Sequence, residues 1–284
     1  MEAYVMDAFS ARVFGGNQAG VALPERELPD ALMQQVAAEF KHSETAFVRV
    51  EEDGSVTLRY FTPAGEVGLC GHATVASFAL LRQLGRIGDG DVTAHTKAGE
   101  LSVTVRGGTV WMDMAAPRLL RELGEDEWAA FYEAYGLTTA DRPEGLTPAI
   151  VSTGLADVML PVRDHDTLMR AVQNEAAVTA LSKKYDVTGV HMFCLGDGCT
   201  AYCSNYAPLY DIPEECATGT SNGALTYYLY LRGLVQPEVE NVFLQGEHMN
   251  RPSEIRSRLY EKDGAVNVRV GSSAVMSMQC EVKI

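Results

Sequence analysis

Two cysteines, Cys70 and Cys216, each stand where a mostly apolar helix is expected to begin. Backbone N–H groups at a helix start have no partner within the helix, and the helix dipole is positive there. Both features lower the pKa of a cysteine, and the same N–H groups can hold a carboxylate. Two such helix starts facing each other would put one base on each side of a bound carbon, as two-base racemisation or epimerisation requires. The alternative at each position is a cysteine that only packs as a small apolar side chain.

The surroundings of these two cysteines resemble each other. The shared order is a strand, an aromatic-x-proline loop, a cysteine and an apolar helix that ends at glycine, over residues 58–85 and again over residues 202–233. A helix that is apolar nearly all round must be buried. The period is too long for a solenoid and favours a duplicated domain, unless the few matching residues agree by chance.

Hydrophobic periodicity and turn residues predict the remaining elements. Strands are expected at 4–9, 21–23, 45–50, 56–61, 91–96, 101–106, 109–114, 148–154, 158–162, 189–195, 200–206, 256–261, 265–270 and 274–282. Helices are expected at 30–41, 72–84, 123–135, 167–173, 175–185 and 220–231. Ala116-Pro117 is a candidate boundary. We expect an N-terminal domain at 1–116, with 272–284 returning to it, and a C-terminal domain at 117–271.

Composition limits the partners and the compartment of the protein. The 284 residues are 46% hydrophobic and carry a net charge of −15, which repels the phosphates of nucleic acids. No run of about 18 apolar residues predicts a membrane span. The start, Met1–Asp7, holds two acids and no basic region, which is untypical of a signal peptide. We therefore expect a cytoplasmic protein whose six cysteines stay reduced.

A set of short motifs resembles one known family nearly from end to end. They are Asp7-Ala8-Phe9, Gly16-Asn17-Gln18-Ala19-Gly20-Val21, Ser43-Glu44-Thr45-Ala46-Phe47-Val48, Arg59-Tyr60-Phe61-Thr62-Pro63, Cys70-Gly71-His72-Ala73-Thr74, Thr218-Gly219-Thr220, Gln245-Gly246 and Arg251-Pro252-Ser253. Together they resemble the PhzF-like family of phenazine biosynthesis, which shares the fold of diaminopimelate epimerase.

The resemblance implies an α+β fold of two pseudo-symmetric α/β domains, each a curved sheet or barrel around a central helix. It also implies a cleft between the domains, a homodimer, no cofactor and no metal. Glu44 matches the glutamate that acts as acid and base in a proton-shifting isomerisation. The pocket residues that the resemblance implies are Gly71, His72, Ala73, Glu215, Thr218, Gly219 and Thr220.

One position departs from the family pattern. Where the family commonly has Glu-Asp-Pro-x-Thr-Gly-Ser, this chain has Glu214-Glu215-Cys216-Ala217-Thr218-Gly219-Thr220. Cys-x-Thr-Gly is similar to the second catalytic cysteine motif of diaminopimelate epimerase and related racemases. The leading hypothesis is therefore a racemase or epimerase of an amino acid or similar small carboxylic acid, with Cys70 and Cys216 as the two bases. The first alternative is a double-bond-shifting isomerase with Glu44 as acid and base, and another is a non-catalytic binding protein.

Several candidates keep a simpler interpretation. Glu44 can be a surface acid at the start of a strand, although an apolar cleft would raise its carboxyl pKa as a proton carrier needs. His72 can be an ordinary helical residue, or it can bind substrate or position Glu44. Asn17 can hold a substrate carboxylate or cap its glycine-rich turn. The set His191, Cys194, Cys199 and Cys203 lacks the spacing of paired zinc knuckles. No dinucleotide, P-loop or nucleophile-elbow motif is present.

Overall fold

The structure is a computed structural model that describes residues 1–284. Its residues form two compact units, which we call the N-terminal unit (Met1–Asp113 with Gly271–Ile284) and the C-terminal unit (Met114–Val270). The sequence-based prediction put the corresponding boundaries after residues 116 and 271. None of the helices combines the length and the apolar character that a membrane crossing requires.

The N-terminal unit is one mixed sheet with two helices. Its elements are β1 (Glu2–Ala8), β2 (Asn17–Leu23), α1 (Asp30–Phe40), β3 (Thr45–Val50), β4 (Val56–Phe61), β5 (Glu66–Val67), α2 (Gly71–Gln83), β6 (Gly90–Thr96), β7 (Gly99–Arg106), β8 (Thr109–Asp113) and β18 (Ala274–Glu281). The strands pair in the order β18-β1-β2-β3-β4-β6-β7-β8, and β5 adds to β4. Only β2–β3 and β4–β6 are parallel.

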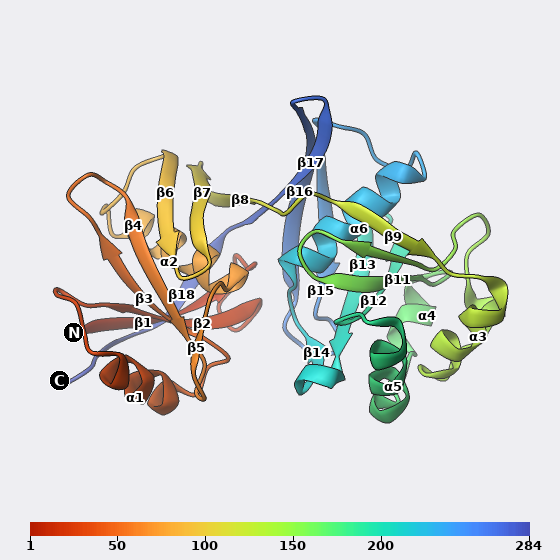
Figure 1. The fold of residues 1–284 in the computed structure, drawn as a ribbon, viewed down its shortest axis with the longest axis horizontal. Helices are drawn as coiled ribbons and strands as arrows, with labels where there is room; N and C mark the ends of the chain where they lie inside the picture. The colour runs from red at the N-terminus through yellow and green to blue at the C-terminus, as the bar shows by residue number, and fades with distance from the viewer. The chain divides into compact units, whose positions relative to one another are not determined.

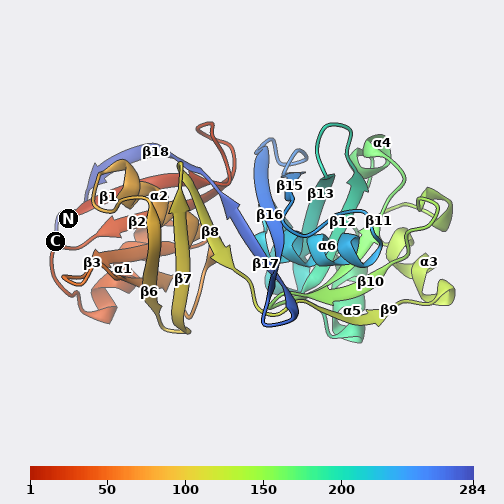
Figure 2. The same ribbon diagram turned by 90° about the horizontal axis from the view of Figure 1, so that it is seen from above.

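Helix α2 is the centre of this unit. It contacts β1, β2 and β3 and also β8 and β18, the two ends of the strand order, so the sheet curves around it (Figures 1 and 2). Every residue from Ala73 to Leu81 is buried, as an all-round apolar helix requires. Gly85 follows in the left-handed conformation with φ 68°, and the N–H of Arg86 donates to the carbonyl of Leu81, which closes the helix as predicted. Helix α1 packs on β3 and β4 through Met33, Val36 and Ala37.

The C-terminal unit repeats the design. Its elements are β9 (Arg118–Glu122), α3 (Glu125–Glu133), the 3₁₀ turn Thr139–Asp141, β10 (Ala149–Ser152), β11 (Ala156–Pro161), α4 (His165–Met169), α5 (Glu175–Tyr185), β12 (Gly189–Leu195), β13 (Ala201–Ala207), the 3₁₀ turn Pro208–Tyr210, β14 (Ile212–Glu215), α6 (Gly219–Leu231), β15 (Glu240–Gln245), β16 (Ser253–Lys262) and β17 (Ala265–Ser272), whose last residues lie in the N-terminal unit. The strand order is β9-β10-β11-β12-β13-β15-β16, with β14 on β13. Helix α6 contacts β9, β10, β11 and β16 and is mostly buried.

The pairing pattern is the same in both units. Along the strand order of each unit, the first two neighbouring pairs are antiparallel. The third pair is parallel, the fourth antiparallel, the fifth parallel and the sixth antiparallel. A short strand, β5 or β14, precedes the central helix in each case, and both central helices have 13 residues. The predicted fold class, with a curved sheet around a central helix in each half, is therefore confirmed, and the sequence echo reflects a repeated topology.

Several element predictions were wrong in detail. Strand β2 begins at Asn17, inside the stretch predicted as a turn, and α4 covers His165–Met169 instead of 167–173. Strands β5, β9, β14 and β15 were missed. All five residues of β9 are exposed, so no alternation marks it. In β15 the buried positions include Asn241 and Gln245, and these polar residues hide its period of two.

Candidate active site

Glu44 is held between two elements of the N-terminal unit. Helix α1 ends at Phe40, its C-cap residue Lys41 is in the left-handed conformation with φ 57°, and the chain then turns into β3. The N–H of Gly20 in β2 donates to the carbonyl oxygen of Glu44 at 3.1 Å, which fixes its backbone. The side chain of Glu44 keeps 21% of its exposure, so it is shielded but reachable.

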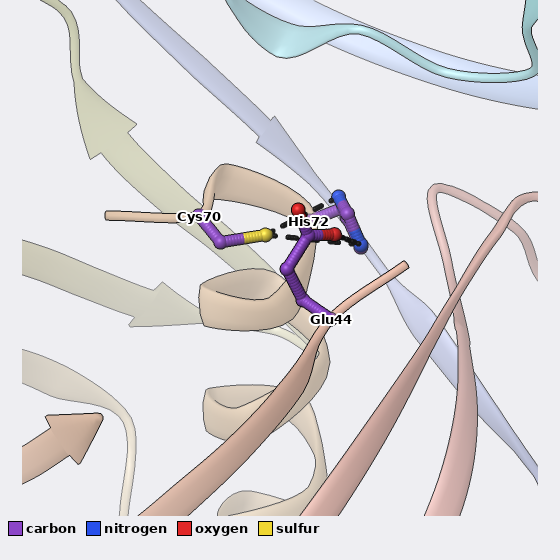
Figure 3. A group of neighbouring side chains, drawn as sticks. All are labelled: Glu44, Cys70 and His72. Carbon is purple, nitrogen blue, oxygen red and sulfur yellow. Dashed lines mark hydrogen bonds and ion pairs between the residues drawn. The ribbon is translucent and has the colours of Figure 1, made fainter. Parts of the chain in front are cut away.

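Cys70 and His72 come from the first turn of α2. Cys70 is the N-cap residue in extended conformation, and its Sγ lies 3.4 Å from Nδ1 of His72. Nε2 of His72 lies 3.2 Å from Oε2 of Glu44 and 3.4 Å from the hydroxyl of Ser43. The three side chains of Glu44, Cys70 and His72 point toward one another in Figure 3. The structure thus brings together three residues that the sequence singled out, and adds Ser43 beside them.

Glu44 and His72 form an ion pair. Burial alone would raise the carboxyl pKa of Glu44, but contacts with His72, Ser43 and Cys70 outweigh it and the pKa is lowered. Burial alone would lower the pKa of His72, but the facing Cys70 and Glu44 raise it well above its ordinary value. The predicted rise of the Glu44 pKa was therefore wrong, because an apolar pocket alone was assumed. At neutral pH Glu44 is a carboxylate, and its charge favours the protonated form of His72.

Cys70 does not behave as the helix-start argument predicted. Its side chain is buried, and burial raises the pKa of its thiol in spite of His72 and the backbone N–H of Ala73. The lowered pKa expected at the helix start was wrong, because the loss of hydration outweighs the stabilising contacts of the thiolate with His72 and the N–H of Ala73. At neutral pH Cys70 is a thiol.

Open space lies in front of α2. Gly71, the first residue of the helix, is exposed, and a Cβ built on it would meet only Cε of Met112, at 3.7 Å. The backbone N–H groups of the first helical turn have no acceptor within the helix. A carboxylate can therefore approach this end of α2 next to the Glu44–His72 pair.

Cys216 occupies a different position from Cys70. The N-cap residue of α6 is Thr218, and Cys216 lies two residues earlier, buried directly after β14. Each central helix has its closing glycine 15 residues after the N-cap, Gly85 after Cys70 and Gly233 after Thr218. The structural counterpart of Cys70 is therefore Thr218. The prediction of two cysteines at matching helix starts was wrong, because two extra residues separate Cys216 from its helix.

The pocket residues expected in the C-terminal unit lie around the start of α6. Glu215 ends β14 half-buried, Thr218 caps the helix, and Gly219 and Thr220 are its first two residues. Asn17 of the N-terminal unit is buried at the first position of β2.

Gln245, which was not among the predicted site residues, connects β14 to the start of α6. Its Nε2 donates to the carbonyl of Glu215 at 2.6 Å, and its Oε1 accepts from Asn222 at 2.8 Å and from the N–H of Thr218 at 3.3 Å. The fully buried amide thus ties β14 to the start of α6. The Gln245-Gly246 motif was the only sequence signal for Gln245. In the N-terminal unit, the motif that contains Glu44 was likewise the only sequence signal for Ser43.

His191 belongs to a buried polar network. Nδ1 of His191 lies 3.2 Å from the amide of Asn205, which also donates to Ser221 at 3.0 Å. Ser221 in turn donates to Asp157 at 2.5 Å. Burial lowers the pKa of His191 to about 3, so the ring is neutral. The network links α6 to β11, β12 and β13.

The C-terminal unit has no equivalent of Glu44. Val67 and Glu215 both lie three residues before a helix cap, and their strand partners are Tyr60 and Asn205. Tyr60 pairs in turn with Ala46, and Asn205 pairs with His191. Two residues before these partners lie Glu44 and Gly189, which therefore correspond to each other. A Cβ at Gly189 would collide with the carbonyl oxygen of Tyr206, so no side chain fits there. An acid at this position is a feature of the N-terminal unit alone.

Comparisons with known proteins give one consistent result. A model of the PhzC-PhzF family, described as phenazine biosynthesis-like proteins, matches residues 6–280. The chain is 31% identical over 274 residues to the uncharacterized isomerase YddE of Escherichia coli O157:H7, covering 95% of this chain and 90% of that protein. A PhzF-family crystal structure from Bacillus anthracis aligns with a TM-score of 0.89 at 25% identity, over 100% of this chain and 99% of that chain. A probable proline racemase from Agrobacterium radiobacter shares the fold, with a TM-score of 0.61 at 12% identity over 100% and 93% of the two chains.

Proposed function

Because this chain belongs to the family of phenazine biosynthesis-like proteins and is an isomerase, we propose that it moves a proton between two carbons of a small carboxylic acid, with Glu44 as the proton carrier. The observation that carries the proposal is the convergence of Glu44, His72 and Cys70 in front of α2. A carboxylate with a lowered pKa is ready to accept a proton at neutral pH.

The reaction would run in two balanced steps. The Glu44 carboxylate removes a proton from a carbon next to a double bond, and the electron pair left behind spreads over the unsaturated system and the substrate carboxylate. Protonated Glu44 then returns the proton to the far carbon, and the double bond has moved. No electrons are gained or lost, and Glu44 ends as it began.

The neighbours of Glu44 would support both steps. The imidazolium of His72 holds the carboxylate in its ionised form and in a fixed direction. The N–H groups of the first turn of α2 would hold the substrate carboxylate and stabilise the negative charge that develops on it. Cys70, as a buried thiol, would contact the substrate and Glu44 without acting as the base.

The rival is the two-thiol racemase, which needs Cys216 as the second base. The displacement of Cys216 from the cap of α6 speaks against an equivalent role for the two cysteines. What favours the rival is that both cysteines are buried next to the start of a central helix.

Replacing Cys216 with serine separates the two functions. A panel of unsaturated and amino-substituted carboxylic acids is incubated with enzyme in D₂O, and proton NMR follows each carbon. We expect the Cys216→Ser variant to keep at least about half of the wild-type turnover, since the proposed proton carrier is untouched. Proton loss at one carbon and gain at another is the expected pattern.

The exposed Cys280 supplies the matched control, because Cys280→Ser changes the same atom far from any predicted site residue in the sequence. Loss of turnover in Cys216→Ser but not in Cys280→Ser, with exchange and inversion at a single α-carbon, would establish the racemase instead.

The pH profile gives an independent test. The carboxyl pKa of Glu44 lies below its ordinary 4.5, so the base form persists as pH falls and is lost only below that value. We expect kcat to stay level from about pH 5 to neutrality. If the Cys70 thiolate were the base, its pKa above the ordinary 9.0 would make kcat small at pH 6 and let it climb beyond pH 9. A profile that rises tenfold per pH unit through neutrality contradicts the role of Glu44.

A further inference from the structure

The three side chains in front of α2 are also a set of metal ligands. Glu44, Cys70 and His72 each offer one ligand atom, and these atoms all lie within 4.8 Å of one another. Sulfur and imidazole nitrogen select zinc and related thiophilic ions over magnesium or calcium, which prefer oxygen alone. The donor set therefore points to one class of cation.

The spacing of the ligand atoms suits a tetrahedral ion. With zinc bonds of about 2.0–2.3 Å, neighbouring ligand atoms of a tetrahedral site lie about 3.3–3.6 Å apart. Nε2 of His72 lies 3.2 Å from Oε2 of Glu44 and 3.8 Å from Sγ of Cys70. Shifts of a few tenths of an ångström would bring these two distances to the required values, and the ligand atoms of Glu44 and Cys70 lie within 4.8 Å of each other.

One of the ligand atoms lacks a hydrogen bond. Oε2 of Glu44 is buried and has no hydrogen-bond partner, although it is at ion-pair distance from His72. A lone pair of this oxygen is thus unused. A water molecule that completes the coordination would enter from the start of α2, where Gly71 is exposed. Three protein ligands and one water form the usual arrangement of an open zinc site.

We propose that Glu44, Cys70 and His72 form a binding site for Zn²⁺ and that the metal-bound form cannot carry out the isomerisation. The inhibition rests on the proposed role of Glu44, because an oxygen bound to the metal cannot accept the substrate proton. Binding releases the thiol proton of Cys70 and any proton on Nε2 of His72 to solvent, because only the thiolate and the unprotonated ring nitrogen coordinate a metal ion. The binding itself rests only on the geometry of the three ligands.

Cobalt titration of the full chain tests the binding directly. Co²⁺ bound to a thiolate shows a sulfur-to-metal absorption band, and competition with Zn²⁺ then gives the zinc affinity. We expect one Co²⁺ per chain with this band in the wild type and in Cys280→Ser. In known metal sites, loss of a residue that supports a ligand weakens metal affinity about 10–100-fold. Cys70→Ser removes a ligand itself, so we expect it to weaken Co²⁺ binding at least about 100-fold and to remove the absorption band.

Cys199→Ser controls for a second site, because Cys199 is another accessible thiol, and it should keep both stoichiometry and band. Circular dichroism of each variant shows whether it is folded. An unchanged band in folded Cys70→Ser, or no band in the wild type, overturns the proposed site and leaves the role of Glu44 untouched. Zinc that binds through Cys70 but leaves turnover unaffected overturns the inhibition, and with it the role of Glu44 as proton carrier.

Discussion

Replacing Glu44 with glutamine is expected to lower kcat by about 10²–10⁴-fold, the usual contribution of a positioned acid–base group. Glutamine has the same shape as glutamate and can keep the 3.2 Å contact with Nε2 of His72. What it loses is the ability to take and return a proton. Steady-state kinetics on the substrate identified in D₂O would measure the effect, with little change in KM.

The fold should survive this substitution. Glutamine keeps the volume of glutamate, the Glu44 side chain is 21% exposed, and the His72 ring can lose its proton, so the cost of removing the charge is limited. Thermal unfolding should therefore still show a folded variant at the assay temperature, which separates lost chemistry from lost structure.

Glu39 on α1 provides the matched control. It is an exposed glutamate of the same unit, and Glu39→Gln makes the same chemical change away from His72. Its kcat should equal that of the wild type. If Glu44→Gln keeps more than about a tenth of wild-type kcat while Cys70→Ser and Cys216→Ser are inactive, the two-thiol mechanism is the correct one.

Gly246→Ala is expected to produce the largest loss of stability, above about 4 kcal/mol. Gly246 has φ +88°, and a Cβ there would collide with the carbonyl oxygen of Arg251 and lie 2.7 Å from that of Cys216. Both obstacles are backbone atoms, which cannot move aside as a side chain can. The segment from Cys216 to the start of α6 would therefore be pushed away from Gln245. Urea unfolding followed by circular dichroism measures the change.

Gly264→Ala isolates the steric part of this effect. Gly264 has a similar φ of +74°, but a Cβ there would meet no atom within 4 Å. Its cost is only that of a left-handed alanine, about 1 kcal/mol. If the two variants lose equal stability, the contact between Gly246 and Cys216 does not hold this part of the C-terminal unit.

The sequence alone determined the framework of the protein. Apolar residues all round the helix before Gly85 predicted its burial, because such a surface has no solvated face. Alternation predicted β3 and β4 to the residue. The motifs also identified Glu44, Cys70 and His72 individually, since each is a residue type that can move a proton. Strands without alternation, such as β9 and β15, carried no such signal.

Only the tertiary structure decided the surroundings of these residues. A pKa depends on the balance of burial and neighbouring charge, and that balance made Glu44 a stabilised carboxylate and Cys70 a neutral thiol, the reverse of both expectations. The place of Cys216 depends on where α6 begins, and the helix begins three residues after it, with Thr218 as its cap. Sequence patterns report local periodicity, whereas ionisation and register arise from contacts between segments that are distant in the chain. For this reason the hypothesis from the sequence rests on a pair of thiols, whereas the function that we propose rests on a carboxylate.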